Sequence, residues 1–164
     1  MNFLDGQKYV KQKKFGKARE IFQKLEKNTN DVRAFFYLGL VNYELNDFVK
    51  SVFYYNKFLK YEKNSIPGLI NLAIVMQTTG EFVKAKNLYF EILKLNKFDV
   101  RSYYGLFNLN PNNLTDKMYT NLSKIETTKK TNFYEKSIIN FLLSKKEKKN
   151  KNIDKEIIFL NKFH

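Results

Sequence analysis

The sequence has no cysteine and a single histidine, His164, which is its last residue. Without cysteine the chain has neither a disulfide framework nor a thiolate metal site, and nothing indicates an oxidising compartment. One terminal histidine cannot form a metal site with a second imidazole, and it is no candidate for a buried general base. We therefore expect no metal and no catalytic imidazole.

Glycine is scarce and scattered. The six glycines stand at positions 6, 16, 39, 68, 80 and 105, so the chain has neither a phosphate-binding glycine-rich loop nor a dinucleotide-binding fingerprint. The carboxylates fall at expected helix surfaces or turns, where solvation or ion pairing is the usual outcome. The sequence therefore predicts no cofactor and no enzymatic activity in this chain, and any catalytic domain would lie outside it.

Long apolar runs are missing too. The longest ones, such as LINLAIVM at 69–76, fall far short of the ~20 residues that a membrane-spanning helix needs. The amino terminus, MNFLDGQKYVKQKK, has no apolar run after a basic start, which argues against a signal peptide. We expect a cytoplasmic protein without a transmembrane segment.

The net charge of +14 suggests nucleic acid or anionic lipid as a partner. However, lysine and asparagine are abundant throughout, together with isoleucine, phenylalanine and tyrosine, as in proteins encoded by A/T-biased genomes. The densest run, KKEKKNKN at 145–152, is of a kind that usually forms a solvated helix end or loop. Nucleic acid is therefore not the expected partner, and binding of RNA or an acidic membrane through the lysines is kept as an alternative.

Two stretches of the chain are nearly the same, DVRAFFYLGLVN at 31–42 and DVRSYYGLFNLN at 99–110. Their starts lie 68 residues apart, which is twice 34. Two blocks of 34 residues, beginning at Val32 and Ile66, align without a gap. Matching positions carry similar residues: Leu38 and Leu72, Gly39 and Ala73, Phe48 and Phe82, Ser51 and Ala85, Tyr55 and Tyr89, Leu59 and Leu93.

Each block has the pattern of two helices joined by a turn. Apolar residues recur every three or four positions, as in an amphipathic helix, on both sides of the turns ELNDF and TTGEF. Asp47, Ser65 with the following Pro67, and Asp99 are predicted to mark helix starts. Small residues at 39, 51, 73 and 85 are expected where two helices approach closely. The sequence thus predicts an all-α fold.

This spacing resembles that of the tetratricopeptide repeat family, whose 34-residue unit is a helical hairpin. The pattern is filled by Phe35, Leu38, Gly39, Asn46, Phe48, Ser51 and Tyr55 in one unit and by Leu69, Leu72, Ala73, Gly80, Phe82, Ala85 and Tyr89 in the next. A more divergent copy precedes them, with Gly6, Tyr9, Phe15, Ala18, Phe22 and Leu25 in register, and a partial fourth begins at Val100. The chain departs from the family at Lys63 and Lys97, where a proline is usual, and at Phe58, where a small residue is common. The resemblance implies a right-handed superhelical stack of helix-turn-helix hairpins over residues 1–110, with units at about 1–31, 32–65, 66–99 and from 100.

Residues 111–164 leave the repeat pattern. The stretch NPNN at 110–113 is expected to end a helix early, because proline lacks the amide hydrogen and restricts the residue before it. Apolar periodicity then predicts helices at about 115–127, 132–147 and 153–163. We interpret them as C-terminal capping helices, because stacked hairpins need an end with a polar outer face. The alternatives are that they join the repeats to a part absent from the chain, or that they fill the groove of the stack.

The resemblance also implies a concave groove lined by the first helix of each unit. The family's groove positions fall on Phe3, Gln7 and Arg33, and on the residues that we predict to bind a peptide: Phe36, Tyr37, Leu40, Tyr43, Ile70, Asn71, Ile74, Gln77, Arg101 and Tyr104. Aromatic residues near arginine are typical of binding hot spots, although the apolar members could equally pack against a neighbouring hairpin. The polar members favour binding, because burying them unpaired would be costly.

The predicted function is a non-catalytic scaffold or adaptor that binds a protein or peptide partner. Phe36 and Leu40 stand where chaperone-binding relatives have lysine and asparagine, so an extended or helical segment with apolar side chains is the expected ligand. The alternative is the repeat region of a larger transferase of the sulfotransferase or glycosyltransferase type. SIINFLLSKKEKK, within the C-terminal region, is weakly similar to a segment that joins such repeats to a sulfotransferase domain.

Overall fold

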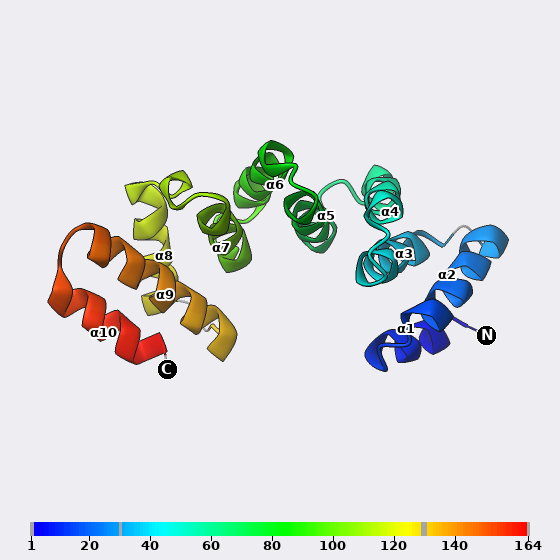
Figure 1. Ribbon diagram of the computed structural model, residues 1–164, viewed down its shortest axis with the longest axis horizontal. Coiled ribbons are helices and arrows are strands. Elements are labelled where there is room, and N and C mark those ends of the chain that lie inside the picture. The colour runs from blue at the N-terminus through cyan, green and yellow to red at the C-terminus, as the bar shows by residue number, and fades with distance from the viewer. Residues whose placement is uncertain (1, 30, 129–130, 164) are drawn as a thin grey trace. The chain divides into compact units, whose positions relative to one another are not determined.

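The computed structural model describes residues 2–29, 31–128 and 131–163, and His164 lies outside them. All regular structure in these ranges is helical (Figure 1), so the expected all-α fold is confirmed. The helices are α1 Phe3–Lys11, α2 Phe15–Thr29, α3 Val32–Glu44, α4 Phe48–Tyr61, α5 Ile66–Thr78, α6 Phe82–Leu95, α7 Val100–Leu109, α8 Asp116–Thr128, α9 Phe133–Lys149 and α10 Ile153–Phe163, with a short 3-10 helix at Pro111–Asn113.

The helices divide into two compact units, residues 1–88 and 89–164, and the division falls within α6. In the first unit α1 packs on α2, α2 on α3, α3 on α4, and α4 on α5. In the second unit α9 packs against α7, α8 and α10. The expected boundary between a repeat array and an extension at residue 110 stays a prediction, because compactness divides the chain at another point.

Polar side chains fix where the helices begin. Asp47, Ser65 and Asp99 each accept a hydrogen bond from a backbone amide of the following first turn, at 3.2, 3.4 and 2.9 Å. These bonds satisfy amides that a helix start would otherwise leave unpaired, and they confirm the three predicted starts. Further caps were not predicted, among them Asn2, Asp31 and Asn132.

One turn geometry joins the two helices of a hairpin at four places. Lys13, Asn46, Gly80 and Lys151 have φ values of 57°, 59°, 81° and 58°, in the left-handed region. In every case the next residue donates its backbone N–H to the carbonyl five positions back, at 2.8 or 2.9 Å. Three of these turns lie in the predicted repeats. The fourth joins α9 to α10, so the last two helices form a hairpin of the same kind, which the sequence analysis did not predict.

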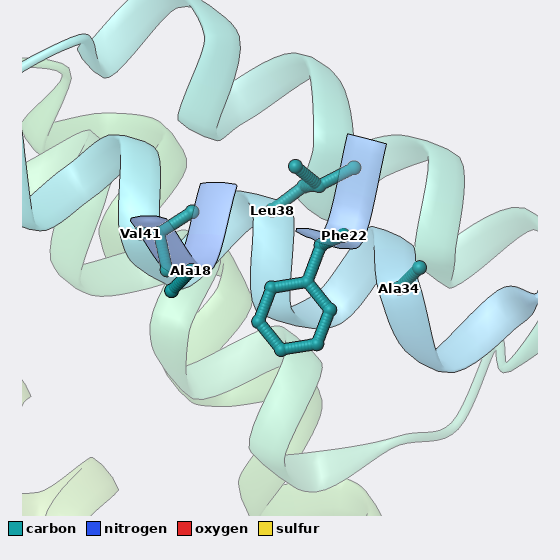
Figure 2. Packing of buried hydrophobic residues seen from close by; sticks show 5 residues of the cluster. All are labelled: Ala18, Phe22, Ala34, Leu38 and Val41. Atoms are coloured by element: carbon teal, nitrogen blue, oxygen red, sulfur yellow. The ribbon is translucent and has the colours of Figure 1, made fainter. Parts of the chain in front are cut away.

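Small residues allow helices to cross closely in the first unit. Ala18 and Phe22 of α2 meet Ala34, Leu38 and Val41 of α3 in a buried cluster (Figure 2). All five side chains have an exposed fraction of 0%. The small alanines of both helices thus leave room for the larger side chains of Phe22 and Leu38 between them.

The next crossing, between α3 and α4, depends on Gly39. A Cβ atom at this position would lie 2.8 Å from the ring of Tyr55, closer than side chains tolerate. Ser51, on α4, donates its hydroxyl to the Gly39 carbonyl at 2.8 Å. The predicted placement of small residues at helix crossings is therefore what the structure shows here.

Candidate functional site

An open cleft of about 480 Å³ lies in the first unit. It is lined by residues of α1 and α3 with one residue of α4, namely Phe3, Leu4, Gln7, Arg33, Phe36, Tyr37 and Phe58. We call these seven residues the aromatic cleft. Five of them were mapped from the sequence as groove positions. Leu4 and Phe58 were missed.

Edge-to-face ring contacts fix the wall of the aromatic cleft. Phe36 makes such contacts with Tyr37 and Phe58, with ring centroids 5.5 and 5.3 Å apart. Phe3 contacts Tyr37 in the same way at 5.3 Å. Gln7 donates its side-chain amide to the Tyr37 hydroxyl at 2.7 Å, which ties α1 to α3. The wall is therefore largely apolar, and its polar side chains Gln7 and Tyr37 are hydrogen-bonded to each other.

Arg33 stands at the edge of the aromatic cleft. Its guanidinium carbon lies 4.4 Å from the centroid of the Phe3 ring, within cation–π range. The same group donates to both carboxylate oxygens of Asp31, with the shortest N–O distance 2.7 Å. These hydrogen bonds lower the pKa of the Asp31 carboxyl. Arg33 thus already has an anionic partner within the protein.

Phe58 fills a position where the repeat pattern has a small residue, and Gly68 compensates for its size. A Cβ atom on Gly68 would lie 2.8 Å from the Phe58 ring. The glycine at the start of α5 therefore gives Phe58 the room to reach the cleft. The sequence signal was the pairing of an unexpected phenylalanine with a glycine ten residues later.

Four of the predicted groove residues make contacts within the first unit, and their role in binding stays a prediction. Ile70 is buried, with 5% of its surface exposed. Leu40 is half-buried between two apolar clusters. The Tyr43 hydroxyl lies 3.3 Å from the Thr78 hydroxyl and so connects α3 to α5. Asn71, the fourth, is considered with the polar residues.

The argument that the polar groove residues lack partners does not hold for two of them. Burial raises the pKa of the Tyr55 hydroxyl, and the Asn71 side chain lowers this pKa by a smaller amount, so Asn71 acts on a group inside the protein. Arg101 forms an ion pair with Asp99 at 2.7 Å. Their polarity is thus explained inside the protein and no longer favours a ligand. Of the remaining groove residues on α5, Ile74 is exposed and Gln77 is half-buried.

Arg101 and Tyr104 belong to the second unit. Tyr104 contacts Phe141 of α9, with ring centroids 6.2 Å apart. It lines a cavity of about 300 Å³ together with Tyr134, Ser137, Ile138 and Phe141. Within this unit α9, one of the helices after the predicted repeats, therefore lies against the face of α7 that carries Tyr104.

Neither a metal site nor a membrane-spanning helix is found in the part of the chain that the structure describes. In the described part of the chain, no three histidine, cysteine, aspartate or glutamate residues gather as a metal site would require. Across those same ranges, no helix combines the length and the apolarity that a bilayer crossing needs.

Comparison with known proteins shows which fold the chain has. No family model matches the chain. The uncharacterized protein ycf37 of Guillardia theta is 32% identical over 83 residues, which are 51% of this chain and 42% of that protein. The chain thus spans less than half the length of this curated relative.

Solved structures match nearly the whole chain. A crystal structure of MamA has a TM-score of 0.72 at 18% identity and covers 99% of this chain and 95% of that one. The 41-end form of MamA from Desulfovibrio magneticus RS-1 has a TM-score of 0.68 at 15% identity, with 95% and 89% covered. A tetratricopeptide repeat protein from Parabacteroides merdae ATCC 43184 has a TM-score of 0.67 at 18% identity, with 97% and 62% covered. At these identities the likeness establishes the fold.

Proposed function

Because the chain has the fold of the tetratricopeptide repeats, we propose that it is a protein-interaction module and that the aromatic cleft holds an apolar side chain of a partner segment. The observation that carries the proposal is the cleft itself, an open hollow of about 480 Å³ with four aromatic residues among its seven lining residues. Leu4, one of the lining residues, exposes 69% of its surface. Large apolar side chains gathered at an open hollow are typical of interaction sites.

The chemistry of the cleft selects an aliphatic or aromatic anchor. Arg33 is paired with Asp31, Gln7 and Tyr37 are hydrogen-bonded to each other, and the other four lining residues are apolar, so most of the cleft favours an apolar group. Burying one such anchor contributes about 1.5–3 kcal/mol, which is roughly 10- to 150-fold in affinity. A single anchor is therefore too weak alone, and the partner segment must make further contacts along the first unit.

The test is selection of peptides from a random library on the immobilised protein, followed by fluorescence anisotropy of the enriched peptides. We expect enrichment of bulky apolar residues. Leu4→Asp should weaken binding by about tenfold or more, because it places a charge beside the anchor without disturbing the core. Val49→Asp is the matched control, since Val49 is 83% exposed on α4 and does not line the cleft.

Two results would contradict this function. Either no apolar peptide is enriched, or the enriched peptides bind both aspartate variants equally well. Circular dichroism of both variants checks that the helices are intact. The transferase alternative receives no support from the comparisons, and the cytoplasmic location stays a prediction.

A further inference from the structure

Besides the aromatic cleft, the first unit has a cavity of about 400 Å³ at the turn of the first hairpin. Its lining residues are Asp5, Lys8, Tyr9, Gln12, Lys14 and Lys17, and we call it the basic turn cavity. Among residues 2–29, none of its three lysines forms an ion pair with a carboxylate. The Lys17 ammonium lies 5.8 Å from the centroid of the Tyr9 ring. Its one carboxylate, on Asp5, accepts a hydrogen bond from the Asn2 amide at 2.8 Å.

The equivalent positions of the next two hairpins show what the first one lacks. There an acidic residue comes before the phenylalanine that starts the second helix, and a lysine follows it three positions on. Asp47 pairs with Lys50 at 2.6 Å, and Glu81 pairs with Lys84 at 3.2 Å. In the first hairpin these two positions are Lys14 and Lys17.

The backbone hydrogen bond is the same at the three turns. The first hairpin therefore differs from the other two in the side chain, which is a lysine in place of an aspartate or glutamate. Lys14, Asp47 and Glu81 each donate their amide to the carbonyl five positions back, at 2.9, 2.8 and 2.8 Å. The two positions that hold a carboxylate and a lysine in the other hairpins thus both hold lysine in the first hairpin. Two unpaired ammonium groups at this spacing repel each other and favour an external anion.

We propose that the basic turn cavity binds a phosphate group, with Lys14 and Lys17 contacting its oxygens and Lys8 completing the charge. A phosphate carries up to two negative charges and three acceptor oxygens, so one group can meet several lysines at once. The cavity volume lies within the range of small-ligand sites. The phosphate belongs to a compact soluble phosphate compound or to a lipid headgroup, and the experiment separates these sources.

The test titrates the full chain with inorganic pyrophosphate by isothermal titration calorimetry at low ionic strength. A parallel arm measures co-sedimentation with phosphatidylcholine vesicles that contain or lack phosphatidylinositol 4-phosphate. Binding in the first arm alone identifies a soluble ligand, and stronger binding to the phosphoinositide vesicles identifies a headgroup. Both results support the proposal.

The decisive variant is Lys14→Asp, which restores the acid–lysine pair of the other hairpins. It should lower the association constant by about tenfold or more, because it removes a cation and supplies Lys17 with an internal carboxylate. It should also raise the midpoint of thermal unfolding, because aspartate caps α2 as Asp47 caps α4. Loss of binding in this variant cannot then be a consequence of unfolding.

A matched pair of variants separates the cavity from the general charge of the protein. Lys8→Gln with Lys17→Gln removes two charges at the cavity, and Lys24→Gln with Lys27→Gln removes two charges from exposed positions on α2 outside it. The first pair should weaken binding by about tenfold or more, and the second by less than about twofold. Equal losses, unchanged binding by Lys14→Asp, or no binding in either arm would overturn the proposal.

Discussion

Two helical glycines of the first unit should respond in opposite directions to the same substitution. Gly39 lies where α3 crosses α4, and a Cβ atom there would lie 2.8 Å from two ring atoms of Tyr55. Gly16, in the first turn of α2, has no heavy atom within 4 Å of the same added atom. Gly39→Ala and Gly16→Ala therefore make the same chemical change with and without a steric conflict.

The expected magnitudes follow from the surroundings of Tyr55. Its ring cannot retreat easily, because it is 2% exposed and contacts Phe36 at 5.9 Å between ring centroids. Overpacking of this kind costs about 1–3 kcal/mol, while exchanging glycine for alanine within a helix contributes about 0.5–1 kcal/mol. We expect Gly39→Ala to lower the free energy of unfolding by about 1–2 kcal/mol, and Gly16→Ala to raise it by about 0.5 kcal/mol.

Equilibrium urea unfolding followed by circular dichroism measures both changes. The comparison between the two variants is informative even where a repeat protein unfolds in more than one step, because both glycines lie in the first two hairpins. If Gly39→Ala proves as stable as Gly16→Ala, then the two helices cross at a greater distance than described, and the role given to the small residues is wrong.

Two further predictions concern a turn and a tyrosine. Gly80→Ala should lower the free energy of unfolding by about 1 kcal/mol, measured by urea unfolding, because the backbone at φ 81° is strained for a residue with a Cβ atom. The pKa of Tyr54 is raised to about 12, first by burial and then by its hydrogen bond to Glu26, so the neutral phenol stabilises the fold below the usual tyrosine pKa of about 10, and this stabilisation is lost as the pH rises through about 12. A spectrophotometric titration of Tyr54→Phe should show one late-titrating tyrosine fewer than the parent protein, because the raised pKa values of Tyr55, Tyr103 and Tyr119 remain. Unfolding data for this variant should show a shallower decline at alkaline pH.

The helices could be predicted because their signals are local. Periodic apolar residues, the caps at Asp47, Ser65 and Asp99, and the early stop before Pro111 all depend on residues within one or two turns of each other. The C-terminal helices were predicted within two residues of their ends for the same reason. Their hairpin turn was missed, because Lys151 takes the left-handed conformation without being the glycine that marks such turns.

The site was harder to predict, because exposure depends on contacts between distant residues. Ile70 and Ile74 lie one turn apart on α5, yet their exposed fractions are 5% and 38%. The partner of Asn71 is Tyr55, which comes sixteen positions earlier on another helix. A family pattern places residues on a helix face, but it does not determine whether a neighbouring hairpin covers that face.

The two proposed sites share one helix but use different faces of it. Phe3, Leu4 and Gln7 of α1 line the aromatic cleft, whereas Asp5, Lys8, Tyr9 and Gln12 line the basic turn cavity. At 3.6 residues per turn the two sets have mean directions about 140° apart around α1, although Leu4 and Lys8 lie one turn apart on the same side. Leu4→Gln, which adds no charge beside Lys8, should therefore weaken apolar peptides and leave pyrophosphate binding unchanged, and Lys8→Gln with Lys17→Gln should do the reverse. If either change abolishes both activities, α1 has come away from α2, and neither measurement then reports on a site.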